Sequence, residues 1–230
     1  MGGNICVLDS APQPIEEFYK LATKYGIDAM FHRTDVTNEA ELSDSFDHVV
    51  ENMSSIDGLV TAAGIAIDKP FVDYTWAEVR KILDVNVIGT FFCVQQAAKQ
   101  MIRQGRGGSI VLISSICATT TAPGHKLSAY HSSKGAIKML NTALSVELGQ
   151  YKIRVNSISP GYIESDMTRK MRDENPALTQ LMHSTPPLQR IGRSDDLTGA
   201  LIYLLGDTSQ YTTGSDTMVT GGLHAGRSEQ

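Results

Sequence analysis

A tyrosine and a lysine four residues apart are the side chains of this sequence best suited to proton transfer. Tyr130 and Lys134 stand in the stretch AYHSSKG, at the expected start of a helix, so they share one helix face about one turn apart. A tyrosine is a poor general base at its usual pKa of about 10. A nearby ammonium stabilises the phenolate and lowers that pKa, which predicts proton transfer near neutral pH.

A serine fifteen residues before that tyrosine could hold the reacting oxygen. Ser115 ends the apolar run SIVLISS, which we expect to be a buried strand. The C-terminal ends of strands are where open parallel sheets bind ligands. A hydroxyl there can hydrogen-bond the oxygen of a carbonyl or an alcohol. Together, Ser115, Tyr130 and Lys134 indicate acid–base chemistry at a carbonyl.

The surrounding segments predict an α/β fold. Strands are expected at 5–9, 27–31, 58–60, 109–114, 153–159 and 216–220, and helices at 15–25, 39–53, 76–103, 130–150 and 195–205. This alternation indicates a doubly wound, Rossmann-like, mostly parallel sheet flanked by helices, in a single domain spanning 1–230. The helix at 76–103 is apolar nearly all round and is expected to be buried on more than one side. The stretch 164–193 is expected to be an irregular lid over the site.

Composition narrows the range of partners and compartments. A net charge of −5 argues against nucleic acid or an anionic membrane as a partner, and no apolar run approaches the roughly 18 residues of a membrane span. Cys6, Cys93 and Cys117 are too few for a disulfide framework, and no signal peptide is visible, so a reducing, cytoplasmic location is expected. The histidines show no metal-ligand spacing, so no metal is expected. His125 and His131 flank Tyr130 and either touch substrate or face solvent.

The sequence resembles the short-chain dehydrogenase/reductase family from Ile5 onward. YHSSK resembles the family's Tyr-x-x-x-Lys signature, with Ser115 as its serine. DVNVIG resembles the family's Asn segment, which implies that Asn86 holds a water in the proton relay to Lys134. The resemblance thus implies a catalytic set of Asn86, Ser115, Tyr130 and Lys134.

The same resemblance implies a site for NAD or NADP. TAAG resembles the turn that lines the adenosine side, with Thr61 in place of the usual Asn, and SPGYIESDM resembles the Pro-Gly turn beside the nicotinamide. The implied cofactor contacts are Asp9, Asp35, Val36, Ala62, Ala63, Gly64, Tyr130, Lys134, Pro160, Gly161, Ile163 and Ser165. NAD is favoured, because a carboxylate at Asp9 would accept hydrogen bonds from the ribose hydroxyls and would repel a 2′-phosphate.

The opening stretch departs from the family pattern. ICVLD resembles the family's second strand, whereas nothing in the sequence matches G-x-x-x-G-x-G, the turn whose helix N-terminus cradles the pyrophosphate. The fold is therefore expected to lack the usual first βα unit, to leave unpaired strand edges unless the neighbouring strands close up, and to bind dinucleotide weakly. Either the chain has rearranged to bury the gap, or it is a shortened product of a longer reading frame.

Three functions remain open on the sequence. The first is an NAD(P)-dependent oxidoreductase that interconverts a carbonyl and a secondary alcohol by hydride transfer, with Tyr130 as acid/base. Its Ser–Tyr spacing resembles that of fungal sorbose-reductase and mannitol-dehydrogenase-like members, which indicates a ketose or polyol. The second is an inactive relative that binds a partner or a regulatory ligand, and the third is a cofactor-independent isomerase, lyase or cyclase. Because long helices pair across a two-fold axis in the resembled family, a homodimer or homotetramer is expected.

Overall fold

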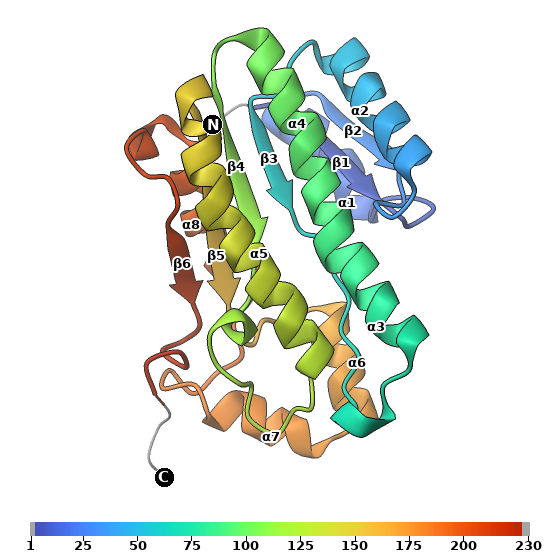
Figure 1. The fold of residues 1–230 in the computed structure, drawn as a ribbon, viewed down its shortest axis with the longest axis vertical. Helices are drawn as coiled ribbons and strands as arrows, with labels where there is room; N and C mark the ends of the chain where they lie inside the picture. The colour runs from blue at the N-terminus through green and yellow to red at the C-terminus, as the bar shows by residue number, and fades with distance from the viewer. Residues whose placement is uncertain (1–2, 227–230) are drawn as a thin grey trace.

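The structure, a computed structural model, describes residues 3–226, in which strands and helices alternate (Figure 1). The strands are β1 (Ile5–Asp9), β2 (Ala29–Arg33), β3 (Gly58–Thr61), β4 (Gly108–Ile113), β5 (Ile153–Pro160) and β6 (Asp216–Val219). The α-helices are α1 (Glu16–Tyr25), α2 (Glu39–Met53), α3 (Trp76–Leu83), α4 (Thr90–Gln104), α5 (Ser128–Glu147), α6 (Asp166–Glu174), α7 (Ala177–Ser184) and α8 (Ser194–Leu205). Between them lie the 3-10 turns η1 (Phe71–Asp73), η3 (Ile116–Ala118), η4 (Gly149–Tyr151) and η5 (Asp207–Ser209), and a π-helical turn, η2 (Asp84–Gly89).

The strands form two separate parallel sheets. β1 pairs with β2, while β3, β4, β5 and β6 pair in that order. Among the described residues, β1 and β3 each have one unpaired edge, and apolar side chains stand open there: Ile5 is 40% and Val60 is 37% exposed. The doubly wound α/β class is confirmed. The neighbouring strands have not closed up, so the unpaired edges that the sequence predicts are present.

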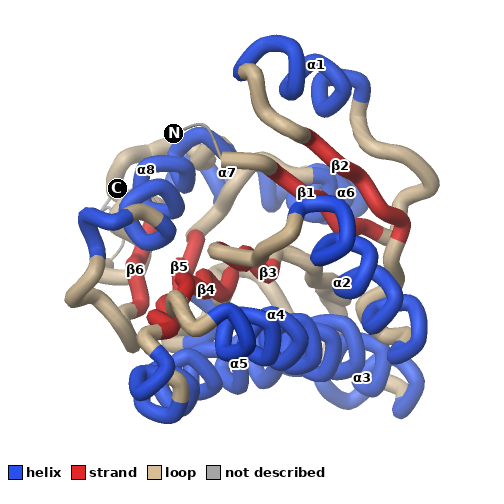
Figure 2. The backbone as a smooth tube through the Cα atoms, turned by 90° about the horizontal axis from the view of Figure 1, so that it is seen from above, coloured by secondary structure: helices blue, strands red, loops and turns tan. Residues whose placement is uncertain are grey.

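Helices cover the four-stranded sheet on both faces. α4 and α5 lie against one face and α8 lies against the other (Figure 2). α1 and α2 lie on opposite sides of the β1–β2 pair, and α2 also packs against α4. The packing of α2 on α4 therefore helps to join the small sheet to the large one. Within residues 3–226, no helix has both the length and the apolar character needed to cross a membrane.

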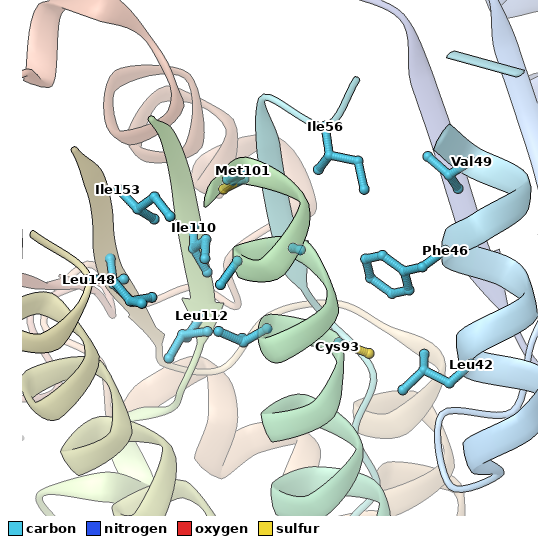
Figure 3. Packing of buried hydrophobic residues seen from close by; sticks show 14 of the residues in the cluster. Leu42, Phe46, Val49, Ile56, Cys93, Met101, Ile110, Leu112, Leu148 and Ile153 are labelled. Atoms are coloured by element: carbon cyan, nitrogen blue, oxygen red, sulfur yellow. The ribbon is translucent and has the colours of Figure 1, made fainter. Parts of the chain in front are cut away.

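The two faces of β4 enter different parts of the core, because side chains alternate along a strand. Ile110 and Leu112 join the cluster drawn in Figure 3, which α4 and α5 complete. Val111 belongs to a second cluster, with Ile158 and Leu204 on the α8 side. The three β4 side chains are all 0% exposed, as expected for a central parallel strand with a continuous apolar run.

The long helix expected at 76–103 is interrupted by a wider turn. Thr75 and Glu78 form a capping box where α3 begins, and the chain then passes through the π-helical turn η2 into α4. The close of that turn requires a glycine, since a Cβ on Gly89 would lie only 2.7 Å from Val36 Cγ2. Such turns are frequent at functional sites.

The prediction that the helix at 76–103 is buried on more than one side is wrong for the single chain. Trp76 is 87% exposed, and Phe91 and Phe92 are each 43% exposed. The opposite side of α4 is buried, with Ala97 and Met101 at 0% exposure. The apolar excess that the sequence shows is therefore on the outside of the chain.

The strand expected at 27–31 begins two residues later, at Ala29. Gly26, in the left-handed conformation, closes α1, and the amide of Ile27 still donates a hydrogen bond to the main-chain oxygen of Ala22. The helix expected at 130–150 is likewise shifted, with α5 followed by the 3-10 turn η4.

The prediction that residues 164–193 form an irregular lid is wrong, because this stretch contains the helices α6 and α7. Leu178 and Met182 of α7 are 5% and 0% exposed, and they pack with Ile116 and Cys117 from the turn after β4. The segment is therefore part of the buried structure next to Ser115.

Candidate active site

The C-terminal ends of β3, β4 and β5 bring the candidate catalytic residues to one edge of the large sheet. Ser115 follows β4, Asn86 lies in the π-helical turn η2, and Tyr130 and Lys134 lie in the first two turns of α5. In parallel sheets this edge is the usual place for a ligand. α5 packs against η2, η3 and β5, which fixes these elements relative to one another.

The Ser115 hydroxyl is close enough to Tyr130 to act on it, and it favours the ionised form of the phenol. Ser115 is buried, and its Oγ accepts a hydrogen bond of 3.1 Å from the amide of Cys117. Tyr130 is half-buried and packs against the cluster of Cys117, Tyr162 and Met182. The structure therefore brings Ser115 and Tyr130 together.

The Lys134 ammonium lies beside the tyrosine ring in a buried position. Its Nζ is 5.7 Å from the centre of the Tyr130 ring and donates a 2.8 Å hydrogen bond to the main-chain oxygen of Ile113. Lys134 as a whole is only 5% exposed. Burial lowers the pKa of Lys134 to about 8, while the nearby Cys117 thiol acts weakly in the opposite direction.

The expected lowering of the Tyr130 pKa is wrong for this state of the protein. Burial raises the pKa of Tyr130, the neighbouring Cys117 raises it further, and the nearby Ser115 hydroxyl offsets only part of this effect. Desolvation disfavours the phenolate more than nearby groups favour it. The tyrosine is therefore protonated near neutral pH and set up as an acid rather than a base.

Asn86 is fully buried and holds two site-bearing segments together. Its Oδ1 accepts a 2.8 Å hydrogen bond from the amide of Ile65, and its Nδ2 donates to the oxygen of Ile65 and to Ser133 Oγ, each at 2.9 Å. Ser133 Oγ in turn donates to the main-chain oxygen of Tyr130 at 2.8 Å. Both N–H groups of the Asn86 amide are thus used within the protein, so this side chain could offer a relay water only its acceptor, Oδ1.

The turn after β3 approaches the same centre. A Cβ placed on Gly64 would lie 3.5 Å from Asn86 Oδ1 and 3.6 Å from Lys134 Nζ, so this backbone passes directly beside the two side chains. Ala62 and Ala63 are exposed. The Thr61 hydroxyl is buried and has no hydrogen-bond partner among the described residues.

The residues expected to contact the adenosine lie on the small sheet. Asp9 is exposed at the end of β1, with Oδ1 accepting a 2.8 Å hydrogen bond from the amide of Ala11. Asp35 accepts two hydrogen bonds from Thr37, which lower the pKa of its carboxyl. Val36 packs at the end of the π-helical turn, as its closeness to Gly89 shows. None of the contacts found in residues 3–226 joins Asp9 or Asp35 directly to Tyr130.

The Pro-Gly turn continues β5 at the same edge. Gly161 lies so close to Thr220 that a Cβ would be 2.9 Å from its Cα, and Pro160 pairs with Val219 in the sheet. Ile163 forms an isolated bridge with Gly192. The hydroxyl of Ser165, expected at the nicotinamide, caps α6 by accepting a hydrogen bond from the amide of Thr168 at 3.3 Å.

The structure therefore brings together Asn86, Ser115, Tyr130, Lys134 and Gly64, while the aspartates stand apart on the small sheet. Sequence reasoning missed Ser133, which links Asn86 to α5, and the electrostatic influence of Cys117. The signal for Ser133 was its position three residues after Tyr130, which places it on the inner face of α5. No group of three or more His, Cys, Asp or Glu side chains in the described range could hold a metal ion.

Comparisons with known proteins identify the family of the chain. A family model described as "Enoyl-(Acyl carrier protein) reductase" matches residues 1–224. A sorbose reductase of Schizosaccharomyces pombe is 32% identical over 224 residues, which cover 96% of this chain and 86% of that protein.

Two solved structures extend the comparison to the fold. A short-chain type dehydrogenase/reductase from Mycobacterium marinum superposes with a TM-score of 0.91 and 33% identity, covering 96% of this chain and 85% of that one. A gluconate 5-dehydrogenase from Burkholderia cenocepacia, in complex with NADP and tartrate, superposes with a TM-score of 0.87 and 27% identity, covering 96% and 85%. The chain belongs to the short-chain dehydrogenase/reductase family of NAD(P)-dependent oxidoreductases.

Proposed function

We propose that Ser115, Tyr130 and Lys134 form the proton-transfer centre through which this chain interconverts a carbonyl and a secondary alcohol. The observation that carries the proposal is the buried Lys134 ammonium 5.7 Å from the centre of the Tyr130 ring, with the Ser115 hydroxyl close to the same tyrosine. When bound, the dinucleotide supplies or accepts the hydride. The chain's own residues handle the oxygen and its proton.

Each of the three side chains has one task in carbonyl reduction. Ser115 donates a hydrogen bond to the carbonyl oxygen and orients it, and Tyr130 donates its proton to the same oxygen. The Lys134 ammonium stabilises the phenolate that remains. In alcohol oxidation the same proton returns to Tyr130. The raised pKa of free Tyr130 supports the acid role, since it keeps the phenol protonated before the reaction.

The residues present fit a dinucleotide at its two ends. Lys134 has three N–H donors, of which one is used by Ile113 within the described residues, and the Thr61 hydroxyl lacks a partner there. Tyr130 and Lys134 would hold the nicotinamide riboside, with Pro160, Gly161, Ile163 and Ser165 nearby, while Asp9, Asp35, Val36, Ala62, Ala63 and Gly64 would hold the adenosine. For the pyrophosphate, residues 3–226 offer no Gly-rich turn at a helix N-terminus between β1 and β3.

The substrate that we propose is a ketose or polyol. The similarity to a sorbose reductase supports this class, as does the similarity to a gluconate 5-dehydrogenase. The direct test is to follow NADH and NADPH absorbance with a panel of ketoses, polyols and simple ketones. Turnover with no member of the panel at saturating dinucleotide would contradict the proposal and favour an inactive relative or a cofactor-independent enzyme. The three free thiols in residues 3–226 support a cytoplasmic location.

NAD(H) is expected to bind more tightly than NADP(H), by about tenfold, because Asp9 would repel a 2′-phosphate. The structure adds one residue to this prediction: Arg33 is the register partner of Asp9 on β2 and offers a nearby positive charge. Asp9→Ala is expected to remove the preference, and Arg33→Ala to increase it. Fluorescence titration of the three proteins with both cofactors measures this. A wild-type preference for NADP(H) would show that Arg33, rather than Asp9, dominates the ribose site.

A homodimer or homotetramer is expected, since apolar side chains stand exposed on the helices that pair in the family. These are Trp76 on α3, Ile88 on η2, Phe91 and Phe92 on α4, and Met139 and Val146 on α5. Light scattering at micromolar concentration is expected to give two or four times the 25.0 kDa chain mass. Val146→Glu is expected to lower that mass, whereas Ile202→Glu on α8, the matched control, is not. A monomeric wild type would contradict the prediction.

A further inference from the structure

One buried hydroxyl of α5 joins the helix to a neighbouring segment of the candidate active site. Ser133 is 0% exposed, and its Oγ donates a 2.8 Å hydrogen bond to the main-chain oxygen of Tyr130, about one turn earlier in the helix. The same Oγ accepts a 2.9 Å hydrogen bond from Nδ2 of Asn86. Because its one proton is given to the helix, the hydroxyl can offer a neighbour only acceptor lone pairs. The Asn86 amide supplies the donor that such a group needs.

Asn86 extends this contact to a third segment. Its Oδ1 accepts a 2.8 Å hydrogen bond from the amide of Ile65, and its Nδ2 donates a second hydrogen bond, of 2.9 Å, to the main-chain oxygen of Ile65. The hydrogen bonds therefore run from the turn after β3, through η2, to the first turns of α5. A buried polar network whose members are satisfied makes the segments that it joins rigid.

The turn held in this way lies directly beside the Lys134 ammonium. A Cβ placed on Gly64, the residue before Ile65, would be 3.5 Å from Asn86 Oδ1 and 3.6 Å from Lys134 Nζ. Lys134 follows Ser133 in the same helix, so a movement of the helix start that took Ser133 away from Asn86 would also move Lys134 relative to this turn. The contact between Ser133 and Asn86 therefore determines how the helix start meets the turn.

The preceding serine shows what is particular to Ser133. Ser132 Oγ also donates to a helix oxygen, that of Ser128, at 3.0 Å. Ser132 is exposed, however, and within residues 3–226 no hydrogen bond joins its side chain to another element. Such bonds from a serine back to its own helix do not stabilise the helix. Helix formation therefore accounts for neither serine, and only Ser133 has a partner on another element.

We propose that Ser133 is a positioning residue for proton transfer, which acts through Asn86 to hold Tyr130 and Lys134 in place against the turn at Gly64. This inference rests on the proposed function, because it assigns a role in the reaction of that centre. Ser133 itself touches neither substrate nor cofactor, since it is fully buried and its hydroxyl is used twice within the protein. Loss of the hydroxyl is expected to misplace the reacting groups without removing any of them.

The first experiment needs no turnover, so its failure can be told apart from a failure of the proposed function. Amide hydrogen exchange is followed by NMR in the wild type, in Ser133→Ala and in the matched control Ser132→Ala. In Ser133→Ala, exchange at the Ile65 amide is expected to become about tenfold faster, because the Asn86 side chain that binds this amide loses an anchor. Ser132→Ala is expected to exchange like the wild type. Unchanged exchange at Ile65 in Ser133→Ala overturns the inference, whether or not the protein reduces ketones.

The second experiment measures positioning by steady-state kinetics at saturating NADH, with the ketose that the wild type reduces fastest. In Ser133→Ala, kcat is expected to fall about tenfold with KM unchanged, because a small misplacement slows the reaction without weakening substrate binding. Ser133→Cys, which keeps a weak donor and acceptor of similar size, is expected to recover part of kcat, and Ser132→Ala all of it. Circular dichroism confirms that the variants fold. A wild-type kcat in Ser133→Ala, or a loss confined to KM, overturns the inference.

A double-mutant cycle tests the route through Asn86. If Ser133 acts through that side chain, the kcat of the double variant Asn86→Ala, Ser133→Ala is expected to equal that of Asn86→Ala within about twofold. Independent action would instead multiply the two losses. Multiplied losses would show that Ser133 acts within α5 alone, and they overturn the inference.

Discussion

Replacing Tyr130 by phenylalanine is expected to lower kcat for carbonyl reduction by a factor of roughly 10² to 10⁴, the usual contribution of a positioned acid. The substitution removes the proton donor, the phenol hydroxyl, while the ring keeps its place against Cys117 and Tyr162. Even where a hydroxyl makes a hydrogen bond, its loss costs only about 1 kcal/mol, so the fold is expected to persist. Steady-state rates at saturating NADH and a denaturant midpoint measure the two effects separately.

Tyr151→Phe on the turn η4 is the matched control, because Tyr151 is 42% exposed and far along the chain from the site. Its kcat is expected to equal that of the wild type. A Tyr130→Phe protein that turns over at the wild-type rate would assign the proton to another group. In that case the Ser115–Tyr130 pair would have a structural role only.

The pH profile of the same reaction has a definite direction. Burial lowers the pKa of Lys134 to about 8, so the ammonium that stabilises the phenolate is present below about pH 8 and is lost as the pH rises through that value. The kcat/KM for reduction is therefore expected to fall above about pH 8, since kcat/KM reports the ionisations of the free enzyme. In Lys134→Met this decrease is expected to be absent, on top of a slower reaction at every pH.

The 230-residue chain by itself is expected to bind NADH at least about a hundredfold more weakly than a family member that carries the Gly-rich turn. At a helix N-terminus, several backbone N–H groups and the helix dipole hold the pyrophosphate. Hydrogen bonds to charged groups contribute about 1.5–3 kcal/mol each, and each 1.4 kcal/mol is tenfold in affinity. Two or three such bonds without a substitute account for the predicted loss.

A fusion tests this explanation. A strand–Gly-turn–helix segment from a relative, placed ahead of Gly2, offers a partner for the unpaired edges of β1 and β3. The fusion is expected to recover both NADH affinity and turnover. The same segment with its turn glycines changed to valine is the control: it can pair with the strands but has no cradle for the pyrophosphate, so stability should rise without affinity. Low-micromolar NADH affinity of the original chain would contradict the account, because another turn would then have to bind the phosphates.

The sequence predicted the order of elements and the closeness of Tyr130 and Lys134 because both depend on local patterns. A continuous apolar run such as SIVLIS predicts a buried strand. The four-residue spacing of Tyr130 and Lys134 predicts that the two side chains share one face of a helix. The site beyond these residues depends on contacts between distant segments. Asn86 meets Ser133 forty-seven positions away, and Asp68 meets His125 fifty-seven positions away. No spacing rule reports such pairs.

The direction of the Tyr130 pKa could not be predicted for a related reason. The sequence shows that a lysine is near, which favours the phenolate, but it does not show how deeply both groups are buried. In the structure, burial acts on both groups and dominates for each: it raises the tyrosine pKa and lowers the lysine pKa. The sequence shows which charged residues lie near Tyr130, whereas the exposure of Tyr130 and Lys134 to water depends on the whole fold.

The π-helical turn sets the rotational phase between the two halves of the long helix. Each residue of an α-helix advances the chain by about 100°, so one extra residue in a turn rotates α3 by about that angle relative to α4. Within α4 itself the apolar residues lie on two sides of the helix: Val94 is 1% exposed and Phe91 is 43% exposed. Deleting one residue from η2 would restore a regular helix, but it would swing either α3 or the core-facing side of α4 out of position and take Asn86 away from Ile65. The one extra residue in η2 thus allows the continuous helix formed by α3, η2 and α4 to pack against the core through α4 and to place Asn86 in the active site at its middle.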